Sequence, residues 1–164
     1  MPRRVTGRGV LAGVTALATA AALGLSRWGD RVVVTGPSMT PALRPGDRLL
    51  VHRTRRVRPG QLVVVGDPRT PARDVVKRVA GAPGDTVVVD GRTLRAGDGV
   101  LVVGDDRRRS TDSRHYGPVP ARLVRGRPWY RYAPPGRAGL LQAGTGVSRR
   151  ATPAAPEPSG RGPR

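Results

Sequence analysis

The stretch that decides the fold is DVVKRVAGAPGDTVVVD, residues 74–90. Two valine-rich runs flank Ala82-Pro83-Gly84-Asp85, and Pro-Gly between apolar runs is typical of a tight turn. The segment therefore predicts a strand over 74–80, a turn, and a second strand over 86–90. Since side chains alternate along a strand, Lys77 is expected on the apolar face of Val75 and Val79, with Arg78 on the opposite face, within reach of water.

The same pattern continues on both sides of this stretch. Short runs rich in Val and Leu predict further strands at 32–35, 48–53, 61–65, 100–103 and 123–132, with turns at 44–47, 58–60 and 90–91. Many short strands without long helical segments between them favour a compact β-barrel or sandwich over βαβ units. We therefore expect a mainly β domain over 32–135, preceded by a linker at 26–31.

The two ends of the chain have a different character. Residues 1–8 are basic and residues 9–25 carry no charge, which predicts a single transmembrane anchor with the N-terminus in the cytoplasm and the domain on the outer face. A cleaved secretory signal remains an alternative, because Ala18-Thr19-Ala20 offers a small-x-small site. Residues 136–164 are rich in Gly, Pro, Ala and Arg, and they predict a disordered tail.

The composition narrows the chemistry. Thirty basic residues against 11 acidic ones give a net charge of +19, which favours anionic partners such as membrane lipid. The arginines are spread along the whole chain and aromatic residues are few, so we expect no specific nucleic acid. There are no cysteines, which excludes thiolate nucleophiles and zinc–cysteine sites, and the two histidines show no metal-ligand spacing. We expect neither metal nor cofactor.

Lys77 is the only lysine in the chain, and the other 29 basic residues are arginines. Arginine keeps its proton in proteins, whereas a desolvated lysine can lose it and act as a base. A lysine that extends its amine to the surface is the alternative. A base needs a nucleophile, and Ser38 stands between Pro37 and Pro41 on a stiff turn that follows an apolar run.

Three segments stand out together: Ser38-Met39-Thr40-Pro41, then residues 77–85 (KRVAGAPGD), then the polar stretch 104–117 (GDDRRRSTDSRHYG). In this order they resemble the conserved motifs of bacterial type I signal peptidases. The resemblance covers about residues 32–132. It implies a compact β fold like that of signal peptidases and repressor-cleaving proteases, with precursors of exported proteins as substrates.

The resemblance also assigns roles. It makes Ser38 the nucleophile, Lys77 the general base, and Ser110 the residue that orients the lysine amine. Asp112 and Arg114 match the family's structural salt bridge. The backbone N–H of Ser38 belongs to the oxyanion site, Gly36 lies in that region, and Met39 is a candidate for substrate contact.

The chain also departs from the family pattern. Ala42 stands where Thr is usual and Asp106 where Asn is usual, and only 18 residues separate Asp85 from Gly104. Such a minimal domain suits either a general signal peptidase or a dedicated maturation protease with one partner substrate.

Alternatives from other classes remain at this stage. A Ser-His-Asp triad would need His52 or His115, although His52 is expected to be exposed. A repressor-type Ser-Lys autoprotease shares the dyad but needs no apolar anchor. A basic protein that binds anionic lipid or nucleic acid without catalysis, and an inactive homologue, are the remaining two.

Overall fold

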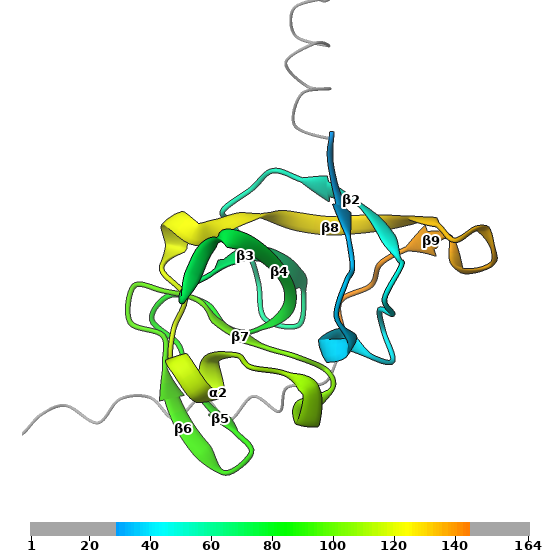
Figure 1. Cartoon of the computed structure of the whole chain (residues 1–164). Coiled ribbons are helices and arrows are strands. Elements are labelled where there is room, and N and C mark those ends of the chain that lie inside the picture. Colours follow the sequence, from blue (N-terminus) through cyan, green and yellow to red (C-terminus); the bar gives the residue numbers. More distant parts are fainter. Residues whose placement is uncertain (1–28, 145–164) are drawn as a thin grey trace, which may run out of the picture.

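The computed structural model describes residues 29–144, which form one mainly β unit (Figure 1). Seven strands make a sheet in the order β1-β2-β8-β3-β4-β7, with β9 paired to β8, and β5 and β6 form a separate hairpin. The strands are β1 Asp30–Val33, β2 Arg48–His52, β3 Leu62–Asp67, β4 Thr70–Gly81, β5 Thr86–Val89, β6 Arg92–Arg95, β7 Leu101–Val103, β8 Val124–Ala133 and β9 Gly139–Leu140.

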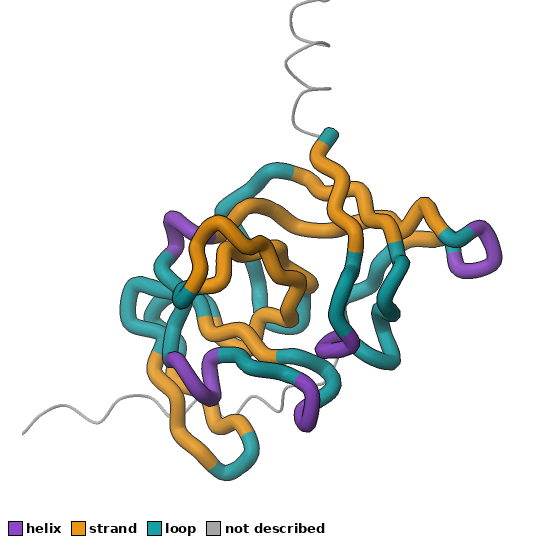
Figure 2. Tube along the Cα trace, in the orientation of Figure 1, coloured by secondary structure: helices purple, strands orange, loops and turns teal. Residues whose placement is uncertain are grey.

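Helical turns occupy only connections between strands (Figure 2). They are the 3-10 turns η1 Pro37–Met39, η2 Arg107–Arg109, η3 Ala121–Leu123 and η4 Pro135–Arg137, and the single-turn helix α2 Ser113–Tyr116. No helix within residues 29–144 has the length and apolar character of a membrane span. The expected anchor at 9–25 lies outside the described residues.

Three Pro-Gly turns link the strands as the sequence predicts. Their glycines, Gly46, Gly60 and Gly84, have φ of 90°, 87° and 87°. Each turn closes with a backbone hydrogen bond across four residues, for example from Asp85 N to Ala82 O at 3.0 Å. Proline followed by a residue with φ near +80° is the geometry of a type II turn, and glycine adopts it without strain.

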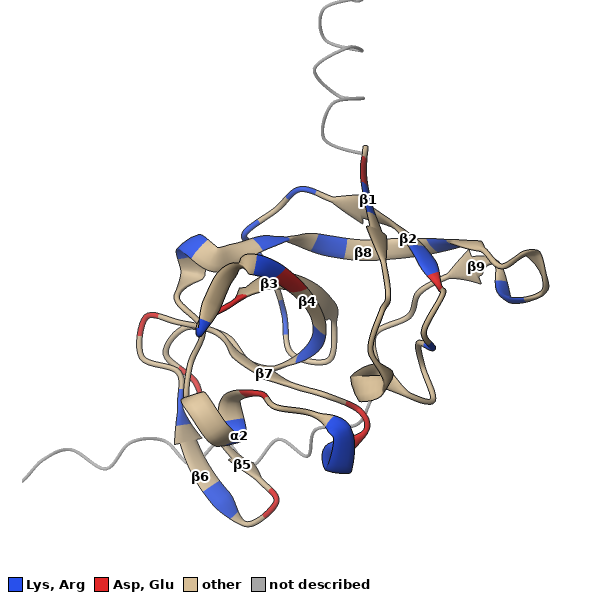
Figure 3. Cartoon of the chain, viewed as in Figure 1, with Lys and Arg blue, Asp and Glu red and all other residues tan. Residues whose placement is uncertain are grey.

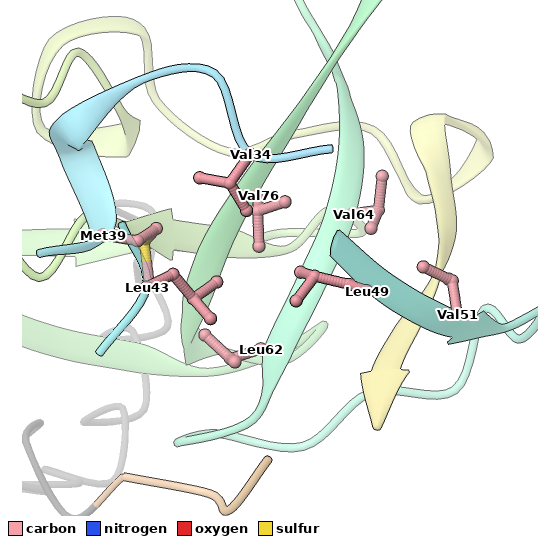
Figure 4. Packing of buried hydrophobic residues seen from close by; sticks show 8 residues of the cluster. All are labelled: Val34, Met39, Leu43, Leu49, Val51, Leu62, Val64 and Val76. Carbon is pink, nitrogen blue, oxygen red and sulfur yellow. The ribbon is translucent and has the colours of Figure 1, made fainter. Parts of the chain in front are cut away.

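Strand β3 and the second half of β4, from Val76 to Gly81, are buried on both faces. Along β3, Leu62 and Val64 enter a first hydrophobic cluster, whereas Val63 and Val65 enter a second. Figure 4 shows the first cluster, which Val34, Met39, Leu43, Leu49, Val51, Leu62, Val64 and Val76 form. Burial on both sides explains why 62–65 is a continuous apolar run and not an alternating one.

All seven predicted strands are present, with ends that differ by a few residues, and two strands were not predicted. β6 has the sequence Arg-Thr-Leu-Arg, in which only Leu94 is partly buried, so it carries little apolar signal. β9 contains two residues and is defined by its pairing with β8.

The expected start of the disordered tail at residue 136 is wrong for the segment 136–144. There, β9 pairs with β8, Leu141 packs against the first hydrophobic cluster, and the N–H of Gly144 donates to Gly60 O at 3.0 Å. Contacts to distant strands therefore order this segment despite its composition. Residues 145–164 lie outside the described residues.

Candidate active site

Ser38 and Lys77 line the same cleft. This cleft has a volume of about 210 Å³, and its walls are β1 with the residues after it, η1, and the first half of β4. Ser38 lies in η1 and is partly exposed. No hydrogen bond joins the Ser38 and Lys77 side chains among the described residues; the amine makes its hydrogen bond elsewhere.

Lys77 is almost completely buried, with 4% of its surface exposed. It lies opposite Val63 on the neighbouring strand β3, on the side of β4 that faces the second hydrophobic cluster. Burial in these apolar surroundings lowers the pKa of the Lys77 amine, and the nearby Arg114 lowers it further, although Asp112 acts in the opposite direction. The predicted apolar environment of Lys77 is therefore present.

A chain of hydrogen bonds holds the amine in place. Lys77 Nζ donates to Ser110 Oγ at 2.8 Å, and Ser110 Oγ donates to Asp112 Oδ2 at 2.6 Å. A neutral amine that donates one N–H to Ser110 still has its lone pair to accept a proton. The geometry thus joins three of the residues that the sequence motifs single out.

Asp112 is fully buried and carries most of the hydrogen bonds of this network. It accepts two hydrogen bonds from the Arg114 guanidinium, at 2.6 and 2.9 Å, and one from the backbone N–H of Gly104 at 2.8 Å. Burial on its own would raise the pKa of Asp112, but the hydrogen bonds from Arg114, Ser110 and Gly104 outweigh it and hold the pKa below the usual range. Asp112 and Arg114 form the salt bridge that the sequence motifs suggest.

Gly104 allows η1 to lie against this network. A Cβ placed on Gly104 would lie 2.3 Å from Ser110 Oγ and 2.6 Å from the backbone oxygen of Ser38. The Ser38 oxygen also accepts a hydrogen bond from Asp106 N at 3.0 Å. Only glycine leaves room for the segments that carry Ser38 and Ser110 to approach so closely.

The two remaining predicted residues also lie in the cleft wall. Gly36 lines it with open space around it, since a Cβ there would meet no atom within 4 Å. Met39 borders the cleft too, but only 1% of it is exposed and it packs in the first hydrophobic cluster. Met39 is therefore part of the cleft floor as well as of the core.

Arg78, expected on the solvent side of β4, is buried instead. Its guanidinium forms a bidentate ion pair with Asp105, at 2.6 and 2.7 Å, and donates a hydrogen bond to Gly60 O at 2.8 Å. The expectation failed because Asp105 lies 27 residues away and compensates the charge only in the folded chain. The sequence offered one indication of this ion pair, because Asp105 directly follows Gly104 in the third motif.

Neither histidine borders the cleft that holds Ser38. His115 Nδ1 accepts a hydrogen bond from Asp112 N at 3.3 Å and completes the N-terminal cap of α2. His52 lies on β2 beside Arg127 of β8. The geometry gives a Ser-His-Asp triad no support. Within residues 29–144, no group of three or more potential metal ligands is present.

Two strand edges face the cleft without a partner strand. Among the described strands, β1 pairs with β2 alone, and β4 pairs with β3 alone until Arg78, where β7 joins it. Both free edges, Val32–Val34 and Arg73–Val76, line the cleft. An extended peptide can add to such edges through backbone hydrogen bonds.

Arginines also reach the cleft, although sequence reasoning did not place them there. Arg69, Arg73 and Arg109 line it beside Asp67 and Asp74. Arg69 is paired with Asp67, and Asp74 with Arg125. The other basic residues are spread over several strands, and η2 consists of three arginines, so no single element holds most of them (Figure 3).

Comparison with known proteins decides the family. A family model described as signal peptidase, peptidase S26, matches residues 7–99 and 96–133. The chain belongs to this family. It is therefore a serine endopeptidase of the signal peptidase type, associated with membranes, and the resemblance inferred from the three motifs is confirmed.

The relatives of this S26 peptidase come from organelles and from bacteria. The mitochondrial ATP-independent inner membrane protease subunit 1a of Arabidopsis thaliana is 39% identical over 133 residues, which cover 69% of this chain and 79% of the relative. Mitochondrial inner membrane protease subunit 1 of Mus musculus is 32% identical, over 70% of this chain and 75% of the relative. A probable signal peptidase I-2 of Synechocystis is 30% identical, over 66% and 65%.

Proposed function

We propose that Ser38 and Lys77 form the catalytic dyad that cleaves targeting segments from exported precursor proteins. The observation that carries the proposal is the Lys77 amine, which is buried, hydrogen-bonded to Ser110 and located in the same cleft as Ser38. A lysine in such a site has a lowered pKa, and a neutral amine is the base that a serine hydroxyl needs.

The reaction begins with the substrate extended along the free edges of β1 and β4. Neutral Lys77 takes the proton of Ser38 Oγ, and the oxygen attacks the scissile carbonyl. Backbone N–H groups near Ser38 and Gly36 stabilise the oxyanion. The protonated amine then gives its proton to the leaving amine, which leaves an acyl ester on Ser38. Lys77 next activates a water molecule, which hydrolyses the ester.

The proposed topology follows from the sequence. Residues 9–25 anchor the enzyme, residues 1–8 remain in the cytoplasm, and the catalytic domain acts at the outer face of the cell membrane. Substrates carry small side chains such as Ala before the cleaved bond, in keeping with the family resemblance.

A second candidate is a dedicated maturation protease with one partner substrate. The short stretch between Asp85 and Gly104, occupied mainly by the β5–β6 hairpin, favours it, because few residues are available there to build a broad substrate surface. Several relatives are named as inner membrane protease subunits.

The test is cleavage of a panel of exported precursors by the full-length protein in lipid vesicles, with product termini determined by mass spectrometry. Ser38→Ala should abolish cleavage without changing the melting temperature substantially. Lys77→Arg should also abolish cleavage, but at a lower melting temperature, because it places a larger and permanently charged group in a buried site. Ser38→Ala is the sharper variant, since it removes only the partly exposed hydroxyl, whereas Lys77→Arg removes the base and also adds a buried charge. Near-normal turnover by either variant would refute the dyad, and cleavage of a single precursor in the panel would favour the dedicated protease.

A further inference from the structure

The turn of the β5–β6 hairpin places a carboxylate on the network that holds Lys77. The turn consists of Asp90 and Gly91, with φ of 52° and 77°. Positive φ at both central residues is typical of a type I′ hairpin turn, where Asp and Asn are tolerated at the first position and Gly is favoured at the second. Asp90 is the only non-glycine residue with positive φ within residues 29–144.

Asp90 contacts the residue that neutralises Asp112. Arg114 donates from Nη1 to Asp90 Oδ2 at 2.8 Å, while its Nε and Nη2 are bound to Asp112. Only 10% of the Arg114 side chain is exposed, so water replaces these partners poorly. The guanidinium is thus fixed between two carboxylates, one from the hairpin turn and one from the N-terminal cap of α2.

We propose that Asp90 is a positioning residue for catalysis, which holds Arg114 against Asp112 and thereby sets the charge that faces Lys77. The proposal rests on the proposed function of Lys77 as the base. Its contacts form an unbroken series, from Asp90 to Arg114, from Arg114 to Asp112, from Asp112 to Ser110, and from Ser110 to Lys77. In this short chain the hairpin turn therefore supports the site directly.

The direction of the effect follows from the charges around Lys77. Asp112 favours the ammonium form of Lys77 and Arg114 opposes it, while Asp67 at the end of β3 and Arg69 after it form a second such pair. The further charged groups of the cleft, Arg73, Asp74 and Arg109, are exposed. If Arg114 loses Asp90 and moves, the buried carboxylate of Asp112 is less neutralised, and the ammonium form of Lys77 is stabilised.

A purely structural role for the same contact is the competing explanation. Asp90 also pairs with Arg107, at 3.1 Å, and this pair would fasten the hairpin to η2 without affecting Lys77. The side chain of Arg107 is 69% exposed, so the pair contributes little to stability. The variant Arg107→Gln separates the two explanations, because it removes this pair and leaves the contact between Asp90 and Arg114 intact.

The experiment measures kcat/KM against pH for the full-length enzyme with a signal-peptide substrate. Asp90→Asn is the test variant, since Asn tolerates positive φ as well as Asp and lacks the charge. Its acid limb should move to higher pH by about half to one unit, which gives a three- to ten-fold loss on the limb with the high-pH plateau retained. Arg107→Gln, and Asp30→Asn, which removes the exposed Asp30–Arg53 pair, should follow the wild-type profile.

The outcomes are distinguishable. An Asp90→Asn limb that is unmoved or moved to lower pH overturns the proposal, as does an equal shift in Arg107→Gln. A lower melting temperature of Asp90→Asn with an unchanged limb shows a structural role only, and also overturns it. If the wild-type enzyme cleaves and the Ser38→Ala variant does not, the proposed function holds whichever result Asp90→Asn gives.

Discussion

Replacing Ser110 by alanine tests the network at its central hydroxyl. The Ser110 hydroxyl accepts from Lys77 Nζ at 2.8 Å and donates to Asp112 at 2.6 Å, and both partners are ionisable and buried. A hydrogen bond to a charged group contributes about 1.5–3 kcal/mol. Since Lys77 becomes charged as it takes the serine proton, its bond to Ser110 is strongest in the transition state. Its loss should lower kcat by about 10- to 150-fold.

Ser113→Ala is the matched control for this prediction. Ser113 is a buried serine three residues away, and its Oγ accepts from Val102 N at 2.9 Å without contacting Lys77. The control should lose about 1–3 kcal/mol of unfolding free energy, because it leaves a buried N–H without a partner, and should keep its kcat. Single-turnover kinetics of both variants, with denaturant unfolding curves, make the comparison. Full kcat in Ser110→Ala, or an equal loss in Ser113→Ala, would refute the reasoning.

Three further predictions follow from the same structure. Lys77→Met should abolish cleavage and raise the melting temperature, since it removes a buried amine whose pKa is lowered. The wild type should become more stable as the pH rises from that lowered pKa to about 10.4. The variant should lack this increase when both proteins are compared by pH-dependent calorimetry. Gly36→Ser should fold normally, because a Cβ there meets no atom within 4 Å, and should raise kcat by supplying a second donor to the oxyanion. A kcat equal to or below that of the wild type would contradict this role. Asp47→Asn should lower the unfolding free energy by up to about 3 kcal/mol without changing kcat, because Asp47 is 1% exposed and pairs with Arg131 and Arg137. An unchanged denaturation midpoint would contradict this prediction.

The sequence predicts those parts of the fold that depend on local pattern. The valine runs and the Pro-Gly turns identify seven strands, since alternation and turn geometry act over a few residues. The segment 136–144 was misjudged because its order depends on β8 and on Gly60, which are distant in sequence. The same reason explains Arg78, whose buried charge is compensated by Asp105.

In the site too, some features follow from the sequence and others depend on contacts between distant segments. The residue types and their order single out Ser38, Lys77, Ser110, Asp112 and Arg114. The sequence contains no sign, however, that the turn residue Asp90 reaches Arg114, because that contact depends on how the hairpin folds back over α2. Positions that bear chemistry can thus be named from motifs, whereas the residues that hold them in place require the three-dimensional structure.

The central claim is that burial lowers the pKa of Lys77 in the folded enzyme. Because Lys77 is the only lysine, protein labelled with lysine carrying ¹³C at Cε gives a single lysine side-chain signal, which can be followed by NMR as the pH is raised. We predict a titration midpoint below the ordinary value of about 10.4, coincident with the acid limb of kcat/KM. A midpoint at or above the ordinary value would contradict the account.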